Sequence, residues 1–523
     1  MTEPSHYTYP ETDIFSAASR HFASLTAVIE YDTGRKHSYM DLELRGRAVA
    51  GFLRELGVGK GSRIAVLTYN SIETIDLLNA SWKLGSIYVP INWRLAPREI
   101  AYILRDVEPR VIVYDASFTG VVEEALKEAK REVLRVSING DSRSSDYLYE
   151  EALRSRTSAR ESLSLEDPLM ILYTGGTTGF PKGALISVRQ VLFNILSEIM
   201  TWRLSRSIRA PIMLPLFHTG GWNLLTLPLL AVGGTIFLRK RFDPAWLVEL
   251  VEAEKGPFVV FAVPTIYYMV SSHKSFGEAR FEEVEWMLSG GAPINKKILE
   301  RFWEKKVKIA QGYGSTEAGP NNLTMPIWEL SLDEIKHRWS SVGKPFAFNE
   351  ISVLREDGSP AGPRELGELV VCSPLSFSGY WGMPEETSKT LRNSCVYTGD
   401  IAYYDEQGFY YIVDRKKDII KSGGEQVYPR ELEEIALTHP LVEDAAVIGV
   451  PDEKWGEVPK LLVKVAKGAR PTKESLLSVY QGKVARYKVP KYVAVIDEIP
   501  RNAAGKILKR ILRERHGEPK DEL

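Results

Sequence analysis

The chain has few cysteines and no long apolar run, and each shortage excludes a class of protein. Cys372 and Cys395 are its only cysteines, too few for a disulfide scaffold or for a cysteine-ligated zinc or iron–sulfur site. The longest apolar run covers 15 residues, from Leu224 to Leu238, and contains Pro228 and two glycines. A membrane-spanning helix needs roughly 20 apolar residues, so this run is predicted to be buried core.

An excess of one charge is also missing. Lysine and arginine number 67 and aspartate and glutamate 68, which gives a net charge of −1. This balance argues against a general nucleic-acid binder and against a polybasic membrane-surface protein. The N-terminus, MTEPSHYTYPETD, has neither the basic start nor the apolar core of a secretion signal. These absences predict a soluble, cytoplasmic protein with no nucleic-acid partner and no integral membrane segment.

The length and the order of apolar patches predict several domains. At 523 residues the chain exceeds what one hydrophobic core usually holds, so we expect two or three domains. The first 115 residues alternate buried-strand and helical patterns, which is typical of a mainly parallel sheet covered by helices. The expected strands are 63–70, 88–92 and 110–115, and the expected helices are 71–85 and 97–107. A second series of apolar patches follows at 169–174, 224–238, 257–264 and 285–293.

The texture of the sequence changes from about Val342. Short strands at 351–357, 367–374, 401–406 and 409–415 are divided by DG, GD and EQG turns, which predicts a small β-rich subdomain over 342–415. A charged stretch follows, and then a helix near 429–437, strands at 443–450 and 460–467, a helix near 473–486 and a strand at 491–496. We therefore predict a large N-terminal domain, residues 1–415, and a small α+β C-terminal domain, residues 416–523.

The strongest local signal is YTGGTTGFPKG, residues 173–183. A loop with four glycines and three threonines can aim several N–H groups and hydroxyls at one anion, with Lys182 supplying charge. It is not the P-loop of nucleotide triphosphatases, because Pro181 precedes the lysine and Ala184 stands where the magnesium-binding hydroxyl would be. The alternative is a flexible surface turn.

Two further glycine-bearing segments follow strands. In QGYGSTE, residues 311–317, a flat ring could lie against Tyr313, and Glu317 beside Thr316 could ligate Mg²⁺ next to a polyphosphate. The glycines of SGGAP, residues 289–293, would let the backbone approach a nucleobase. Taken alone, each segment is equally compatible with a plain turn at the end of a strand.

Three segments in the last quarter of the chain carry charged candidates. YTGD, 397–400, puts Asp400 on an expected turn, where a carboxylate can bind the hydroxyls of a ribose. RKKDIIKSGGEQVYP, 415–429, is either a hinge or a solvated linker. PRNAAGKILKR, 500–510, presents Lys506 after a small-residue turn, or is simply a basic amphipathic helix. His218 is a further candidate, although a lone histidine in apolar surroundings is normally a satisfied wall residue.

Taken in order, the six segments YTGGTTGFPKG, SGGAP, QGYGSTE, YTGD, DRKKDIIKSGGEQVYP and PRNAAGKILKR resemble the adenylate-forming family. This family includes acyl-CoA synthetases, the adenylation domains of peptide synthetases and firefly luciferases. The resemblance covers about residues 25–512. It implies an α/β fold with two layered αβ subdomains, a small β-barrel-like subdomain, and a mobile C-terminal domain that lies across the active site.

The resemblance also implies an acid–thiol ligase that uses ATP, Mg²⁺ and coenzyme A. A carboxylate first attacks the α-phosphate of ATP to give an acyl-adenylate, and the thiol of coenzyme A then displaces AMP. The resemblance implies that Lys506 bridges the carboxylate and the phosphate and that Lys417 is the hinge between the two domains. His218 is included among the candidate catalytic residues. The other implied binding residues are Thr174, Gly175, Gly176, Thr177, Thr178, Gly179 and Lys182 for the departing phosphates, Thr316 for the α-phosphate, Glu317 with Thr174 for magnesium, Gly291, Ala292, Pro293, Gly312, Tyr313 and Gly314 for adenine and its surroundings, Asp400 and Arg415 for ribose, and Lys421, Gly423 and Gly424 for the thiol step.

The acid itself is less closely specified. Acetyl-CoA synthetases of the family carry a tryptophan where Gly314 stands here, so we expect a pocket deeper than acetate needs. The stretch FHTGGWNLLTLPLLAVGG resembles fatty-acyl-CoA synthetases, with Trp222 lining or gating the tunnel. These features favour a medium- or long-chain fatty acid, and leave an aryl- or hydroxyacyl-CoA ligase, or a fatty-acyl-AMP or carrier-protein ligase, as alternatives. The sequence leaves a homodimer open.

Overall fold

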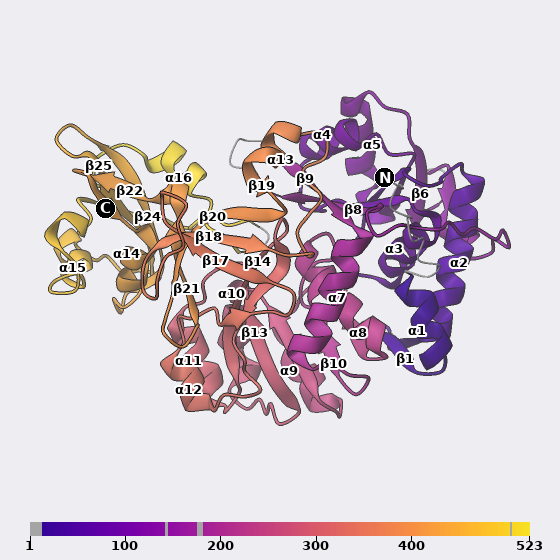
Figure 1. Ribbon diagram of the computed structural model, residues 1–523, viewed down its shortest axis with the longest axis horizontal. Helices are drawn as coiled ribbons and strands as arrows, with labels where there is room; N and C mark the ends of the chain where they lie inside the picture. Colours follow the sequence, from indigo (N-terminus) through magenta and orange to yellow (C-terminus); the bar gives the residue numbers. More distant parts are fainter. Residues whose placement is uncertain (1–12, 142–144, 175–180, 503–504) are drawn as a thin grey trace, which may run out of the picture.

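The computed structural model describes residues 13–141, 145–174, 181–502 and 505–523. Their strands form four sheets. Along the long axis of the molecule, a seven-stranded sheet lies at one end and the C-terminal sheet at the other, with the remaining two between them (Figure 1). The predicted mixed α/β class is confirmed. In this described part of the chain, no helix combines the length and apolarity that a membrane crossing requires.

The seven-stranded sheet contains the strands predicted in the first 115 residues. It is parallel apart from β8 and β9, which pair antiparallel at one edge. In sheet order it comprises β7 (Tyr147–Leu148), β6 (Leu134–Ile138), β5 (Val111–Asp115), β3 (Arg63–Leu67), β4 (Ile87–Pro90), β8 (Pro168–Thr174) and β9 (Lys182–Ser187). Residues of β3, β4 and β5 are buried almost throughout, as expected of parallel strands covered on both faces.

Helices of the N-terminal third pack around this sheet. The predicted helix 71–85 is α3 (Ile72–Leu84), and it ends at Gly85, whose φ of 62° lets its N–H return to the Ser81 carbonyl. The other helices are α1 (Ile14–Phe22), α2 (Tyr39–Glu55), α4 (Pro97–Val107), α5 (Thr119–Ala129) and α6 (Tyr149–Ala152). The apolar cores on the two sides of the sheet therefore come from strands and helices that alternate along the sequence.

The nine-stranded sheet determines where the candidate functional site lies. In sheet order it comprises β16 (Lys344–Pro345), β15 (Gly319–Thr324), β14 (Ile309–Ser315), β13 (Val284–Ser289), β12 (Phe258–Ala262), β10 (Arg209–Pro211), β11 (Thr235–Leu238), β1 (Thr26–Glu30) and β2 (Arg35–Ser38). Strands β12, β13 and β14 are parallel, so the segments that follow them, SGGAP and STE among them, meet at one edge of the sheet. Ligands of open α/β sheets bind at this carboxyl edge.

Helices cover both faces of the nine-stranded sheet. They are α7 (Val188–Trp202), the π-helix η2 (Gly221–Thr226), α8 (Leu227–Val232), α9 (Trp246–Ala253), α10 (Pro264–Ser272), α11 (Lys296–Glu304) and α12 (Leu332–His337). The apolar run 224–238 supplies part of η2, all of α8 and strand β11, and it is largely buried. It is core, as the sequence predicts.

The third sheet is antiparallel and corresponds to the predicted β-rich subdomain. It comprises β17 (Glu350–Leu354), β18 (Gly367–Cys372), β20 (Cys395–Tyr404), β19 (Leu391–Arg392) and β21 (Tyr410–Arg415), with α13 (Pro384–Thr390) beside it. The expected turn at Asp400 is wrong, because Asp400 lies inside β20 and pairs with Arg415 of β21. Gly399 has a φ of 70° within that strand, which explains why the local sequence looks like a turn.

The C-terminal sheet comprises β23 (Glu425–Val427), β22 (Ile420–Ser422), β25 (Gly456–Val465), β24 (Val442–Asp452) and β26 (Tyr492–Val495). The 3₁₀ turn η4 (Lys416–Asp418) leads into it, and α14 (Pro429–Ala436), α15 (Lys473–Ser478) and α16 (Lys509–His516) accompany it. The helix expected over 473–486 is shorter than predicted. It ends at Ser478, and Gly482 follows with a φ of 71°.

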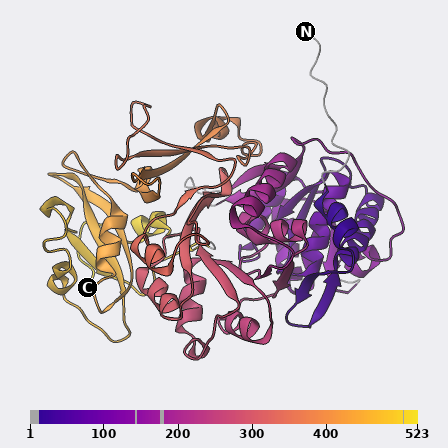
Figure 2. The same ribbon diagram turned by 60° about the horizontal axis from the view of Figure 1, so that its bottom comes forward.

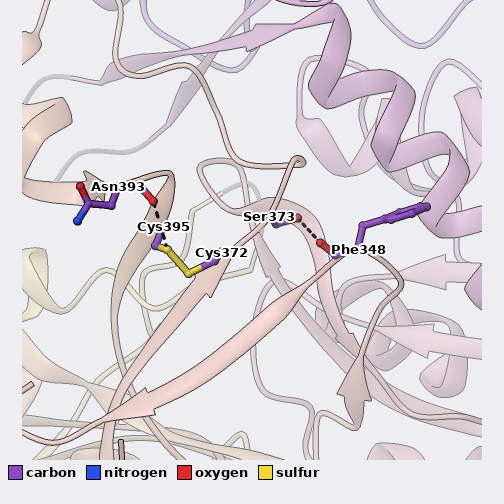
Figure 3. The surroundings of a disulfide bond; sticks show 5 residues. All are labelled: Phe348, Cys372, Ser373, Asn393 and Cys395. Carbon is purple, nitrogen blue, oxygen red and sulfur yellow. Dashed lines mark hydrogen bonds between the residues drawn. A yellow bond between two sulfur atoms is a disulfide. The ribbon is translucent and has the colours of Figure 1, made fainter. Parts of the chain in front are cut away.

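The two cysteines form a disulfide. Cys372 of β18 and Cys395 of β20 are direct partners in the strand register, and their sulfurs are bonded (Figure 3). The bond encloses residues 373–394, a segment that contacts Glu317 and Lys182 and appears above the main body in Figure 2. Two cysteines too few for a scaffold thus make one local cross-link.

We predict that removing this cross-link lowers the stability of the β-rich subdomain. In the entropic model, closing a loop over a sequence separation of 23 raises the free energy of the unfolded chain by about 3 kcal/mol. The double variant Cys372→Ser/Cys395→Ser should therefore unfold at a lower temperature than the oxidised protein. Reductant should lower the midpoint of the native protein and leave that of the double variant unchanged. A native protein indifferent to reductant would contradict the assignment.

Candidate functional site

A narrow cavity of about 80 Å³ opens at the carboxyl edge of the nine-stranded sheet. Of the residues singled out from the sequence, it is lined by His218, Gly291, Gly312, Tyr313, Gly314 and Thr316. These residues come from three separate segments of the sequence, so parts of the SGGAP and QGYGSTE motifs meet His218 at one cavity. Burial lowers the pKa of His218, so this side chain is a neutral wall group near pH 7.

The backbone around the cavity is packed too closely for side chains at two glycines. A Cβ on Gly314 would lie 2.0 Å from the carbonyl oxygen of Pro320, and one on Gly290 would lie 2.6 Å from the Phe261 ring. Strands β14 and β15 therefore need glycine at 314 in this arrangement. A tryptophan at that position, as in the acetyl-CoA synthetases, would require the two strands to be spaced differently.

Asp400 holds the phenol of Tyr313 and the guanidinium of Arg415 on its two oxygens. The Tyr313 hydroxyl donates to Oδ2, and Arg415 Nε lies 3.0 Å from Oδ1. Burial and the neighbouring carboxylate raise the pKa of Tyr313, so it stays a donor. Because Asp400 is only 5% exposed, this carboxylate is fixed in place and can accept further hydrogen bonds from a ligand hydroxyl.

Lys506 reaches the same place from the C-terminal part of the chain. It lies in a turn where Lys506 N donates to Asn502 Oδ1, and a Cβ on the preceding Gly505 would lie 3.9 Å from Val263, a residue of the cavity wall. Burial, and then the charge of Arg415, lower the pKa of Lys506 to about 7. A bound anion would relieve that repulsion and keep the amine protonated.

Glu317 lies beside Thr174, the residue that ends strand β8. Its Oε1 accepts hydrogen bonds from Tyr380 (2.9 Å) and from Thr174 Oγ1 (3.4 Å). Lys182 pairs with Glu386 at 2.5 Å and lies over the Tyr380 ring. Lys182, and then Lys389, lower the pKa of Glu386 to about 2, so this carboxyl is ionised at physiological pH.

Tyr380 and Glu386 were missed by sequence reasoning. Both come from the disulfide-enclosed segment 373–394, and no motif marks them. Segment 373–394 also pairs with the backbone of β9. Trp381 N donates to the Gly183 carbonyl, and Leu185 N donates to the Gly379 carbonyl. Their positions could be found only by seeing a contact that spans 204 residues between Lys182 and Glu386.

The remaining predicted residues fall into three groups. Gly175, Gly176, Thr177, Thr178 and Gly179 lie outside the described residues. Lys421, Gly423 and Gly424 form the β22–β23 hairpin, where Gly423 N donates to Trp455 O and Lys421 N to Glu457 Oε2, and they are absent from the cavity wall. Ala292 and Pro293 follow Gly291 without lining the cavity themselves.

A larger cavity elsewhere, about 570 Å³, is lined by Ser16, Glu43 and Lys83 among others. Its buried ammonium is fully engaged, because Lys83 Nζ lies 2.5 Å from Asp13 and 2.7 Å from Glu43 and also donates to Ser16. A charge neutralised by its own neighbours stabilises the packing of α1, α2 and α3, and we assign this cavity no chemistry.

We predict that Gly314→Ala destabilises the protein. The added methyl has to push β15 away, and overpacking of this kind typically costs about 1–3 kcal/mol. The thermal unfolding midpoint should fall by several degrees. Gly59→Ala is the matched control, since a Cβ there meets nothing within 4 Å, and it should leave the midpoint unchanged. Equal midpoints for the two variants would mean that β14 and β15 are less closely spaced.

Comparison with known proteins gives consistent findings. A family model described as AMP-binding enzyme matches residues 15–381, and one described as AMP-binding enzyme C-terminal domain matches residues 431–506. Feruloyl-CoA synthase from an Amycolatopsis species is 35% identical over 92% of this chain and 95% of its own. For 2-succinylbenzoate–CoA ligase from Geobacillus kaustophilus the values are 34%, 94% and 96%, and for a long-chain-fatty-acid–CoA ligase from Mycobacterium tuberculosis 33%, 94% and 95%.

Solved structures agree in fold. ATP-bound MatB from Rhodopseudomonas palustris has a TM-score of 0.87 at 28% identity and covers 97% of this chain and 99% of its own. The o-succinylbenzoate coenzyme A synthetase of Bacillus subtilis, in complex with ATP and magnesium ion, has a TM-score of 0.83 at 27% identity and covers 96% and 99%. The large N-terminal part and the smaller C-terminal part are both included in these matches.

Proposed function

Because the chain belongs to the AMP-binding enzyme family, we propose that it is an AMP-forming ligase that joins a carboxylic acid to coenzyme A. The observation that carries the proposal is the meeting of Lys506 with Asp400 and Arg415 beside the cavity. The paired strands β20 and β21 and the turn that holds Lys506 bring their charges close together there. Relatives named as coenzyme A ligases and synthetases match almost the whole chain.

The reaction has two halves. In the first, an oxygen of the acid bonds to the α-phosphorus of ATP, and the bond to the departing pyrophosphate breaks. In the second, the thiol of coenzyme A loses its proton and bonds to the acyl carbon, and AMP leaves. The difficulty of the first half is that two anions must approach each other, and positioned cations and donors in a site closed to water lower that barrier.

The residues around the cavity suit a bound ATP. We propose that Asp400 and Arg415 hold the ribose, with Tyr313 and the 291–293 backbone beside the adenine. Thr316, which is 6% exposed, would donate to the α-phosphate. Lys182 would bind the departing phosphates together with the loop 175–180, and Lys506 would span the carboxylate and the α-phosphate.

Glu317 and Thr174 fit a magnesium ion. They are a carboxylate and a hydroxyl 3.4 Å apart, and Mg²⁺ binds through one or two protein oxygens plus phosphate oxygens. When bound, the ion would neutralise charge on the phosphates. Tyr380 then has the task of orienting Glu317, since its hydroxyl donates to the same carboxylate.

We propose that the C-terminal part, residues 416–523, moves as a lid hinged near Lys417. Supporting this, the sheet changes between Arg415, the end of β21, and Ile420, the start of β22, and only the short η4 turn connects them. In the present arrangement Lys506 lies near Arg415 and Asp400, whereas Lys421, Gly423 and Gly424 are absent from the cavity wall. A swing about Lys417 would exchange the two and admit the thiol.

The acid is the open part of the proposal. The sequence favours a medium- or long-chain fatty acid, and one relative bears that name. A specific observation favours the second candidate, an aryl or hydroxy acid, because Thr219 and Asn321 put polar groups in the cavity wall. Trp222 is fully buried against Tyr88 and does not line the cavity, contrary to its expected role at a tunnel. A fatty-acyl-AMP ligase or a carrier-protein ligase stays an alternative prediction. That the protein forms a homodimer and that it is cytoplasmic also stay predictions.

We predict that Lys506→Ala slows acid-dependent AMP release about 100-fold or more, the typical cost of one preorganised donor. The amine must be protonated to act, and its pKa in the free protein is about 7. For the native enzyme, kcat/KM for ATP should therefore be constant below pH 7 and fall above it. The assay is AMP release from a panel of acids, with and without coenzyme A.

The control for this profile is the variant itself, which should lose the fall above pH 7 along with its rate. Release of pyrophosphate that turns over without coenzyme A and without AMP release would favour an AMP-ligase, and AMP release that needs a carrier protein in place of coenzyme A would favour a carrier-protein ligase. No release with any acid would overturn the proposed function. A Lys506→Ala enzyme as fast as the native one would remove the residue from the mechanism.

We predict that Lys417→Pro keeps ATP–pyrophosphate exchange and loses thioester formation. Proline fixes φ near −65°, a value compatible with the 3₁₀ turn that Lys417 now occupies, and so prevents the hinge from rotating. Lys417→Ala is the matched control, since it removes the same side chain but leaves φ free, and it should retain both activities. Equal loss of both activities in the proline variant would refute the hinge.

A further inference from the structure

A buried polar stripe lies behind the wall of the cavity. Gln190, Asn194 and Glu198 are spaced four residues apart on α7 and so share one face of that helix. Each is at most 3% exposed. Buried polar side chains need hydrogen-bond partners, so such a stripe on a core-facing helix calls for an explanation.

Gln190 Nε2 donates to the carbonyl of Thr316, a residue of the cavity wall, at 3.5 Å. Hydrogen bonds connect Glu198 and Asn194 to the cavity by two further routes. Asn321 Nδ2 donates to Glu198 Oε1, and Asn321 lines the cavity. Asn194 Nδ2 donates to the Asn223 carbonyl at 2.5 Å, and Asn223 Nδ2 donates to Thr219 Oγ1 at 3.1 Å. Thr219 also lines the cavity, so both routes end at its wall.

The cluster has more acceptors than donors. Among the described residues, Glu198 Oε2, Asn194 Oδ1 and Asn223 Oδ1 are buried and have no hydrogen-bond partner. Leaving such a group without a partner costs free energy. Burial raises the pKa of Glu198 well above its usual range, which favours the protonated carboxyl, a form that can itself donate.

A hydroxyl group is the ligand that matches this set. It can accept from the protonated carboxyl and donate to an amide oxygen at the same time. A carboxylate suits the cluster poorly, because the partners bonded within it are amides, a hydroxyl and a backbone carbonyl, with no cation among these described residues. An apolar chain would leave the oxygens unpaired.

We propose that Asn321 and Glu198, with Thr219 and Asn223, bind a hydroxyl group carried by the acyl substrate. The inference rests on the proposed ligase function and specifies the class of its acid. Asn321 and Thr219 line the cavity, so a hydroxyl that enters from the cavity would meet them first. A phenolic acid and an aliphatic hydroxy acid share this chemistry.

The test compares matched acids in coenzyme A-dependent AMP release. One pair is 3-(4-hydroxyphenyl)propanoic acid and 3-phenylpropanoic acid, and the other is 8-hydroxyoctanoic acid and octanoic acid. A site that hydrogen-bonds a hydroxyl rejects the analogue without it far more strongly than an apolar pocket rejects an added hydroxyl. In at least one pair, kcat/KM should therefore be about 100-fold or more higher for the hydroxylated acid. The pair that shows it tells phenolic from aliphatic.

Two substitutions at one position connect the preference to the cluster. Glu198→Gln keeps a donor and an acceptor and should keep the preference. Glu198→Leu should abolish it, lowering kcat/KM for the hydroxylated acid and raising it for the apolar one, a change of ratio that a general loss of stability would not produce. If the leucine variant fails to fold, Asn321→Val replaces it and should give the same reversal.

A preference for the apolar acid in both pairs would overturn the inference and leave the ligase function standing. So would a hydroxyl preference that survives Glu198→Leu and Asn321→Val unchanged. Absence of AMP release with every acid would instead overturn the proposed function, and this inference with it.

Discussion

The site depends on two cations that share one carboxylate. Arg415 is bonded to Asp400, and Lys506 comes close enough for the arginine charge and burial to lower its pKa to about 7. Without an anion, this arrangement costs free energy, because like charges repel in a place where water screens them poorly. An anionic ligand reverses the sign of that cost. If the C-terminal part moves as the proposed lid, its position would be coupled to the charge that the cavity holds.

Glu317 and Lys182 are held in place by a different set of contacts. The segment 373–394 is closed by the disulfide and fixed by Trp381, whose indole donates to the Asp106 carbonyl. From this support Tyr380 reaches Glu317 and Glu386 reaches Lys182. Glu317 and Lys182 are thus oriented by partners that belong to none of the predicted motifs. Preorganised groups contribute most to catalysis when their own positions are fixed in this way.

How far the sequence specifies the molecule can be judged from particular elements. Strands β3 and β5 and helix α3 were predicted because burial on both faces or one face leaves a periodic pattern. Asp400 was misplaced because Gly399 mimics a turn inside a strand that is paired on both sides. Tyr380, Glu386 and the Glu198 cluster left no local signal, since their roles arise from contacts between distant segments. Periodicity reports which face is buried, and it cannot report what a buried polar group meets.

The distribution of unsatisfied groups around the cavity is itself an argument about function. Elsewhere, buried charge is neutralised by its neighbours, as Lys83 is by Asp13 and Glu43. Near the cavity, Lys506 faces a second cation, and Glu198 and two asparagines have oxygens without partners. A sequence selected for stability alone would pair or replace these groups, because each costs part of a total stability of only about 5–15 kcal/mol. Buried side-chain atoms without partners also occur elsewhere among the described residues, as at Ser81 and Trp246, so a missing partner alone does not mark a site. What distinguishes Glu198, Asn194 and Asn223 is that hydrogen bonds join them to residues of the cavity wall. A ligand hydroxyl bound there would supply the missing partners.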